Sequence, residues 1–442
     1  MSSLLLRNVK LYWHGDVVEG NIVVENGIIK SVSRKEAPAD VTVEGGGLLA
    51  IPGGIDIHAH IYDPLHHDHE DWRTGSLAGL YGGVTTIIDM PLRVYVDNLD
   101  VLMQKKYEAM KSSYVNYGLT GGFINEQNYQ CIRDLVKHGV VTFKIFTCRP
   151  FMIRDSALPR ALRLIAEYNA VGIIHAEEES LIAYREECLR TRKDPLAYHE
   201  SRTGCVEAAA IMKTGFYAAE TSARVHIAHV SSREGVEAVR YLKERGVKIT
   251  AEVTPHHLYF TRRDVEKLGN LIKVAPTLKN SEDREALWRG LASGVIDVLA
   301  SDNAPAPLVK KLGDVWSAWS GVPSLEVMVP LLYTYGFLQG KISLKRLVEV
   351  IAENPAKILG IYPVKGSLSI GSHADIIVLN TRSTRVISAR THHHKVDWNP
   401  WEGVELYGAP HHVLVNGYLV LESGELVGEP GRGVYVGDLI KR

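Results

Sequence analysis

The sequence predicts an α/β fold: a parallel (β/α)8 TIM barrel with a small β-sandwich domain formed from both chain ends. Through the middle of the chain, short apolar, β-branched runs alternate with helical stretches. At both ends, strands and turns replace that rhythm. The length of 442 residues suffices for one large barrel and a satellite domain. A doubly wound open sheet is the alternative, but no GxGxxG fingerprint follows an early strand.

The two chain ends carry the same kind of pattern. Residues 1–52 alternate apolar and polar side chains between Gly and Asn-Gly turns, which predicts short β-strands. Residues 359–442 return to this pattern in KGSLSIGSHADIIVLN and in HHVLVNGYLVLESGELVGEPGRG. We therefore expect the two ends to fold together into one β-domain, with a C-terminal tail, beside a barrel that occupies residues 53–358.

The barrel is predicted from eight strand-like runs, each followed by a helical stretch such as Leu99–Tyr114 or Ser281–Ser293. Eight such alternations are typical of a closed parallel barrel. The runs are Gly54–His58, Val84–Asp89, Val115–Gly121, Val141–Phe146, Val171–His175, Val225–His229, Lys248–Val253 and Ile296–Ser301.

Composition excludes several classes of protein. Lys and Arg number 50 against 51 Asp and Glu, and this balance argues against a nucleic-acid partner and against membrane docking by charge. No apolar run reaches the roughly 18 residues of a membrane span, and the N-terminal apolar run is too short for a signal peptide. The four cysteines form no CxxC pair, which indicates reduced thiols in a cytoplasmic protein.

Histidines close the first predicted barrel strand in the sequence Asp56-Ile-His58-Ala-His60. Residues i and i+2 of a strand share a face, so His58 and His60 can reach one metal ion at the carboxyl end of the barrel. Two ordinary histidines in a strand-to-loop turn are the alternative interpretation.

Single titratable residues lie at or near the ends of later strands: Lys144, His175, His229 and Asp302. A lysine within the apolar run VTFKIF is costly unless it is paired or chemically altered. Each residue alone also has a structural interpretation. Because all strands of a parallel barrel end at one pocket, however, the joint pattern predicts a metal site.

A series of motifs resembles the cyclic amidohydrolases, which comprise hydantoinases or dihydropyrimidinases, dihydroorotases and allantoinases. The motifs span nearly the whole chain and include IPGGIDIHAH, TFKIF, HAEE, HVSS, TPHHL, ASDNAP and ENPAKILGIYPVKGSLSIGSHADIIVLN. The resemblance implies that His58, His60 and Asp302 hold one metal, that His175 and His229 hold a second, and that Lys144, carboxylated by carbon dioxide, bridges them. It also implies a homodimer or homotetramer.

The implied activity is hydrolytic ring opening of a small cyclic amide. A hydroxide shared by two divalent metals would attack, with Asp302 as general base and then general acid. Burial favours the neutral lysine amine that reacts with carbon dioxide. Zinc suits a nitrogen-rich site best, with manganese, cobalt and iron as alternatives. A non-catalytic scaffold related to dihydropyrimidinases is disfavoured because all six ligand positions are present.

Subfamily signals are mixed. The segment SARTHHHKVDWNPWEGVELYGAP resembles the hydantoinase or dihydropyrimidinase branch, and we rank the substrates of this branch first. The segment DMPL instead resembles allantoinases. Tyr62 stands where dihydroorotases have arginine, Arg149 stands where hydantoinases usually have tyrosine, and Asn303 stands where the family often has histidine. These three residues are the predicted substrate contacts.

Other prominent side chains have structural interpretations. We expect His66, His67 and His69 to lie in a solvated loop. The run His392–His394 is expected to lie in a surface tail, where it would serve structural or interfacial packing. Trp316 and Trp319 are expected either to cap the pocket or to pack against the barrel rim.

Overall fold

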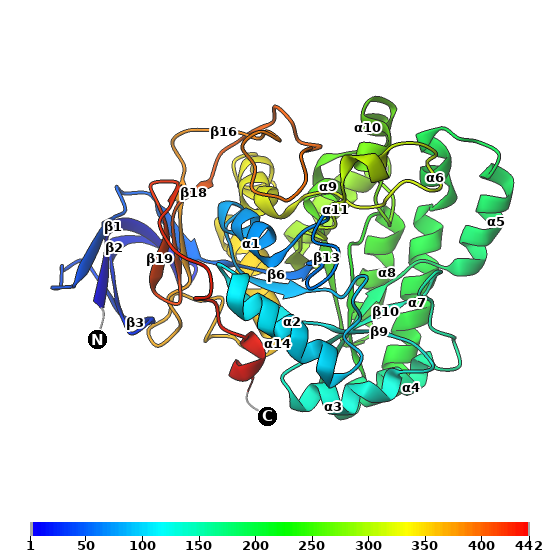
Figure 1. The fold of residues 1–442 in the computed structure, drawn as a ribbon, viewed down its shortest axis with the longest axis horizontal. Coiled ribbons are helices and arrows are strands. Elements are labelled where there is room, and N and C mark those ends of the chain that lie inside the picture. Colours follow the sequence, from blue (N-terminus) through cyan, green and yellow to red (C-terminus); the bar gives the residue numbers. More distant parts are fainter. Residues whose placement is uncertain (1–2, 441–442) are drawn as a thin grey trace.

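The computed structural model describes residues 3–440. A β-domain lies beside a larger helix-covered part (Figure 1). The strands at the start of the chain, in blue, lie next to the red and orange strands near its end. Both chain ends therefore contribute to one domain, as the sequence predicts.

The β-domain is one mixed sheet of nine strands, in the order β20-β19-β18-β15-β5-β1-β2-β3, with β4 also paired to β1. The two chain ends meet where β5 pairs antiparallel with β15. The strands are β1 (Ser3–Trp13), β2 (Asp16–Glu25), β3 (Ile28–Ser33), β4 (Val41–Glu44), β5 (Leu49–Pro52), β15 (Ile376–Asn380), β18 (Ala409–Val415), β19 (Tyr418–Glu422) and β20 (Glu425–Leu426).

Alternation along these strands divides the apolar side chains between two cores. Leu11, Ile22 and Ile376 belong to a core within the β-domain. Ile51 and Ile377, whose side chains lie on the opposite face of the sheet, belong to the main core that also fills the barrel. The β-domain is thus fused to the barrel through a shared apolar layer. A short pair, β16 (Arg385–Val386) with β17 (Glu405–Leu406), lies outside this sheet.

The barrel strands follow the predicted runs closely. They are β6 (Gly54–Ala59), β7 (Val84–Asp89), β8 (Asn116–Leu119), β9 (Gly121–Ile124), β10 (Thr142–Phe146), β11 (Val171–His175), β12 (Arg224–Ile227), β13 (Ile249–Val253) and β14 (Val298–Leu299). The third predicted run is interrupted at Thr120, so that β8 pairs with β7 and β9 pairs with β10. Backbone bonds from Asp302 N to His58 O and from His60 N to Asn303 O, both 2.8 Å, join the last strand to the first.

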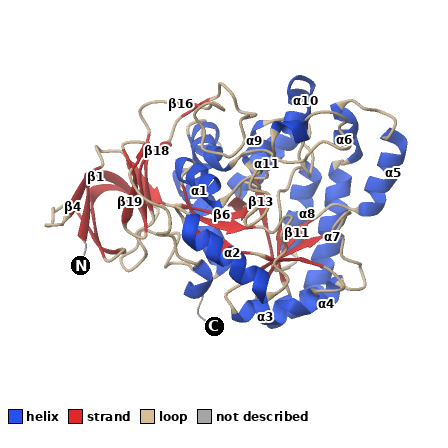
Figure 2. Cartoon of the chain, in the orientation of Figure 1, coloured by secondary structure: helices blue, strands red, loops and turns tan. Residues whose placement is uncertain are grey.

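Helices surround the barrel strands (Figure 2). Three of them lie between β11 and β12, and three more lie between β13 and β14. No helix among residues 3–440 is long and apolar enough to cross a membrane. The helices are α1 (Trp72–Tyr81), α2 (Leu99–Ser112), α3 (Ile132–Lys137), α4 (Leu158–Glu167), α5 (Glu179–Leu189), α6 (Pro195–Ser201), α7 (Gly204–Thr221), α8 (Arg233–Glu244), α9 (Pro255–Tyr259), α10 (Arg262–Leu268), α11 (Ser281–Ser293), α12 (Met328–Leu331), α13 (Leu344–Val348) and α14 (Asn354–Leu359).

Candidate metal centre and active site

A cavity of about 550 Å³ lies at the carboxyl ends of the barrel strands. The six predicted ligand residues lie on barrel strands or just after their carboxyl ends, and all of them line this one cavity: His58, His60, Lys144, His175, His229 and Asp302. All six are buried. The structure therefore brings the predicted set together, at the end of the barrel where active sites of this fold lie.

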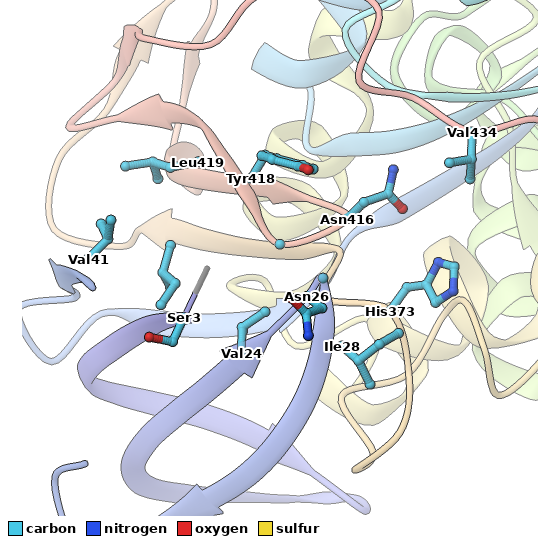
Figure 3. A pocket seen from close by; sticks show the side chains of 13 residues that line it. Ser3, Val24, Asn26, Ile28, Val41, His373, Asn416, Tyr418, Leu419 and Val434 are labelled. Atoms are coloured by element: carbon cyan, nitrogen blue, oxygen red, sulfur yellow. The ribbon is translucent and has the colours of Figure 1, made fainter. Parts of the chain in front are cut away.

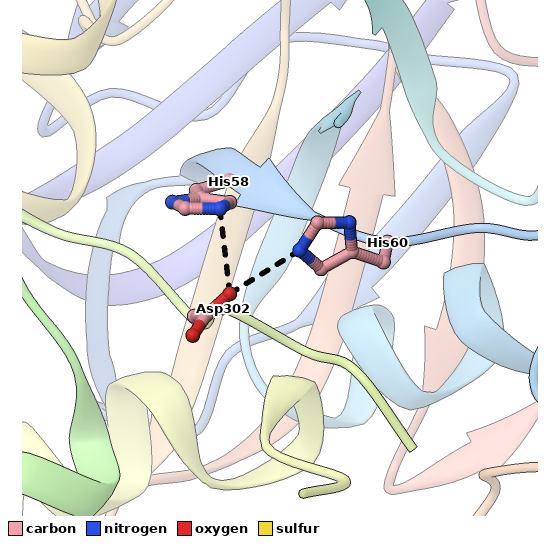
Figure 4. A group of neighbouring side chains, drawn as sticks. All are labelled: His58, His60 and Asp302. Carbon is pink, nitrogen blue, oxygen red and sulfur yellow. Dashed lines mark ion pairs between the residues drawn. The ribbon is translucent and has the colours of Figure 1, made fainter. Parts of the chain in front are cut away.

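His58, His60 and Asp302 form the tightest part of the set (Figure 4). The Nε2 atoms of both histidines lie 3.3 Å from Asp302 Oδ1. Their Nδ1 atoms are engaged on the other side, because His58 bonds to Glu252 and His60 lies 2.9 Å from the carbonyl oxygen of Met90. These outer contacts fix the rings so that both Nε2 atoms face one point, which suits a shared metal ion.

Lys144, His175 and His229 continue the cluster. Lys144 Nζ lies 3.3 Å from His58 Nε2. The His229 ring lies with its centre 5.4 Å from that of His58 and 4.6 Å from that of His175. Burial lowers the pKa of Lys144 to about 8, so about a tenth of this amine is neutral near neutral pH. Lys144 therefore lies beside His58 with part of its amine in the neutral form that carbamate formation needs.

The donor set fits divalent cations. Burial lowers the pKa of His58, His175 and His229, so these imidazoles are neutral ligands. His229 Nδ1 is buried and has no hydrogen-bond partner among the described residues, although buried polar atoms are normally satisfied. His229 and Asp302 also have left-handed backbone angles, with φ of 37° and 46°. Such strain is concentrated at functional sites.

Asp302 remains a carboxylate in this cluster. Burial would raise its pKa, but the imidazoles of His58 and His60 outweigh burial and hold the pKa below its usual range. An ionised carboxylate can both bind a cation and accept a proton.

Two buried glutamates, not predicted as site residues, support the histidines. Glu252 bonds to His58 Nδ1, to His226 Nε2 at 3.0 Å and to the backbone N–H of His229 at 3.1 Å. Glu177 lies 2.7 Å from His175 Nε2 and accepts a 2.6 Å bond from Arg202. The only sequence signal was an acidic residue at the end of an apolar run, in TAEV and in HAEE.

Replacing Glu252 by glutamine is expected to weaken metal binding about 10- to 100-fold, the usual scale for losing an outer carboxylate partner of a ligating histidine. The amide cannot accept from both His58 and His226 as the carboxylate does. Metal titration followed by calorimetry measures the effect. Glu207→Gln is the matched control, because Glu207 is also buried but bonds to Ser231 and Ser232. Equal metal affinity in the two variants would contradict the role of Glu252.

The three predicted substrate contacts lie in different surroundings. Arg149 lines the cavity, but its side chain is 67% exposed and forms an ion pair with Glu179. Tyr62 and Asn303 are buried and are not among the lining residues. The Tyr62 ring packs against His69, and Asn303 Oδ1 accepts a 2.9 Å bond from Ser324 N.

One expectation for the other histidine clusters was wrong. His66 and His67 are exposed as predicted, but His69 is buried, because its Nδ1 meets the Pro305 carbonyl and its ring packs on Trp319. In the run His392–His394, the ring of His393 stacks on Tyr81 at 3.7 Å. Trp316 and Trp319 both line the cavity, so they belong to its wall.

A second cavity, of about 490 Å³, lies in the β-domain (Figure 3). Its described lining residues include His373, Asn416 and Tyr418, but no carboxylate, lysine or cysteine. It offers no convergent set of charged groups, so the barrel cavity is the candidate active site.

Comparisons with known proteins agree with this site. Residues 49–420 match the amidohydrolase family. The chain is 33% identical to the L-hydantoinase of Paenarthrobacter aurescens, over 99% of this chain and 98% of that protein. It is 31% identical to a dihydroorotase of Methanosarcina acetivorans, over 99% and 96%. The solved L-hydantoinase (dihydropyrimidinase) of Arthrobacter aurescens superposes with a TM-score of 0.94 at 32% identity, over 98% and 99% of the two chains. The chain therefore belongs to the amidohydrolase family and, within it, to the hydrolases of cyclic amides.

Proposed function

We propose that this enzyme opens a hydantoin- or dihydropyrimidine-type ring by hydrolysis, with two divalent metal ions, zinc first among them. The observation that carries the proposal is the convergence of four imidazoles, one carboxylate and one buried lysine on a single cavity. A barrel scaffold without chemistry has no need for this set of buried polar groups.

The ligand set divides into two positions. His58, His60 and Asp302 would hold one ion, and His175 and His229 the other. Lys144, as a carbamate, would offer one oxygen to each. When bound, such ions supply Lewis acidity, which makes water more acidic and polarises the scissile carbonyl.

The chain's own residues then transfer the proton. Asp302 accepts the proton of the attacking water through its carboxylate. Water oxygen bonds to the ring carbonyl carbon, and the carbon–nitrogen bond breaks. Asp302 returns this proton to the leaving ring nitrogen, which changes from N–H to NH2, and the new carboxylic acid releases the second proton of water to solvent as it becomes a carboxylate. Asp302 is suited to this because its carboxyl is ionised and its backbone is held in a strained conformation.

Two observations favour a hydantoin or dihydropyrimidine substrate over dihydroorotate and allantoin. They are the similarity to the relatives described above and the presence of Tyr62. The names of the relatives include both L-hydantoinase and dihydroorotase. Tyr62 supplies no charge for a ring carboxylate, and its side chain is fully buried. Dihydroorotase or allantoinase activity with the same mechanism is the alternative. We also propose cytoplasmic location, supported by four free cysteines, and a homodimer or homotetramer.

Ring opening is tested directly with zinc-loaded protein and four substrates: hydantoin, dihydrouracil, dihydroorotate and allantoin. We expect turnover of hydantoin or dihydrouracil, measured as loss of ring absorbance and appearance of the open product. Removal of metal with a chelator is expected to abolish turnover, and added zinc to restore it. Turnover of dihydroorotate or allantoin alone would move the assignment to that ring. No turnover of any cyclic amide would overturn the proposal.

A further inference from the structure

The mouth of the catalytic cavity is rich in cations. Four arginines line the cavity, of which Arg93, Arg149 and Arg190 are exposed and Arg202 is buried. Three of these guanidinium groups have carboxylate partners: Arg149 pairs with Glu179, Arg190 with Glu186 at 3.3 Å, and Arg202 with Glu177 at 2.6 Å. Within the described residues 3–440, Arg93 has no ion pair. Its charge is therefore available to a ligand.

The backbone presents Arg93 at the cavity mouth. Arg93 follows β7, whose carboxyl end opens toward the cavity, and its φ is 70°. A left-handed conformation is uncommon for a long side chain and costs free energy unless the surroundings impose it. The side chain is exposed, and its guanidinium carbon lies 5.2 Å from the centre of the Trp319 ring. A stacked guanidinium loses less freedom when it forms hydrogen bonds.

The Trp319 ring is itself held firmly. Its indole N–H donates a 2.9 Å bond to the Ala304 carbonyl. Beneath the loop, the buried Lys311 ammonium bonds to the carbonyl oxygens of Trp319 at 3.0 Å and Gly321 at 2.8 Å. Lys273, also buried, bonds to the carbonyl oxygen of Ala318. Two buried lysines thus fasten the loop that carries the stacking surface for Arg93.

We propose that Arg93, stacked on Trp319, recognises a carboxylate on the exocyclic arm of the ring substrate. The proposed substrate class is a cyclic amide with an acidic side arm, such as a hydantoin that bears a carboxymethyl group. A guanidinium matches a carboxylate with two parallel hydrogen bonds, and such charge-assisted bonds are among the stronger ones. This inference rests on the proposed function and adds that the exocyclic arm of the substrate is negatively charged.

The test compares two rings of nearly equal size, hydantoin-5-acetic acid and hydantoin-5-acetamide, which differ in charge. In wild-type protein we expect kcat/KM to be at least about tenfold higher for the acid. Arg93→Gln should lower kcat/KM for the acid by about tenfold while changing the value for the amide by less than about threefold. Arg245→Gln is the matched control, because Arg245 is exposed and stacked on Tyr241 outside the cavity.

Each outcome decides a separate point. Equal kcat/KM for acid and amide in the wild type would overturn the inference and leave ring hydrolysis intact. Loss of the acid preference in Arg149→Gln, but not in Arg93→Gln, would move recognition to Arg149. If neither ring is opened, the four substrates named above still decide the proposed function, and calorimetric binding of the two rings decides the inference: tighter binding of the acid, lost in Arg93→Gln, supports it, and equal binding overturns it.

Discussion

Replacing Asp302 by asparagine is expected to lower kcat by about 10²-fold or more while most of the bound metal stays in place. The amide keeps the size of the side chain and one oxygen that can bind a cation. It cannot accept a proton at neutral pH, so water attack and nitrogen departure lose their proton carrier. The effect is large because Asp302 Oδ1 lies 3.3 Å from both His58 Nε2 and His60 Nε2, at the centre of the set.

The measurement combines turnover with metal content. Metal per chain by elemental analysis should remain near the wild-type value, while kcat falls and KM changes little. Asp314→Asn is the control, because Asp314 lies in a nearby loop, pairs with Lys193 and does not line the cavity. A decrease in kcat of only a few-fold would assign the proton transfer to another group. Complete loss of metal would show that Asp302 acts chiefly as a ligand.

The barrel could be predicted because its signals are local. Each strand is a short apolar run, and residues i and i+2 of a strand share a face whatever surrounds them. His58 and His60 follow from that rule alone. Lys144 stood out because a lysine inside an apolar run needs an explanation. The parallel arrangement then places the carboxyl ends of all strands at one pocket. The structure confirms the predicted fold and shows that the six side chains line one cavity.

The partners of these residues could not be predicted, because they depend on distant contacts. Glu252 is 194 residues from His58 in the sequence. Only the closed barrel buries this glutamate beside His58 and so distinguishes it from a glutamate on the surface. The ion pair of Arg149 with Glu179 likewise depends on how the loop after β10 meets the start of α5. His69 looked solvated because its neighbours His66 and His67 are exposed, yet the ring of Trp319, 250 positions away, covers it.

The available charge at Arg93 is also a property of the fold. The sequence shows an arginine two residues after Met-Pro in DMPLR. It does not show that the neighbouring arginines at the mouth have carboxylate partners while Arg93 stacks on Trp319 without one. Strand periodicity therefore allows the metal ligands to be predicted from the sequence. The charge of the substrate depends instead on which cationic side chains the tertiary structure leaves without a carboxylate partner.

Replacing Lys144 by alanine is expected to remove nearly all activity and much of the bound metal. Lys144 is buried, lies 3.3 Å from His58 Nε2 and lines the same cavity as His175 and His229. Alanine leaves both metal positions without their shared anionic ligand, and metal affinity depends on the deprotonated ligand set. We expect metal content to fall from about two ions per chain to below one. Lys365→Met is the matched control, because Lys365 is equally buried but pairs with Asp375 in the β-domain.

Chemical rescue separates the bridging role of Lys144 from simple loss of a buried side chain. A short-chain carboxylic acid such as propionate fits the space left by the lysine and supplies two oxygens, so it should partly restore turnover and metal binding in Lys144→Ala. The same acid should leave the Lys365→Met protein unchanged. Circular dichroism and thermal unfolding verify that both variants are folded. Near-normal metal content and turnover in Lys144→Ala without added acid would refute the bridging role.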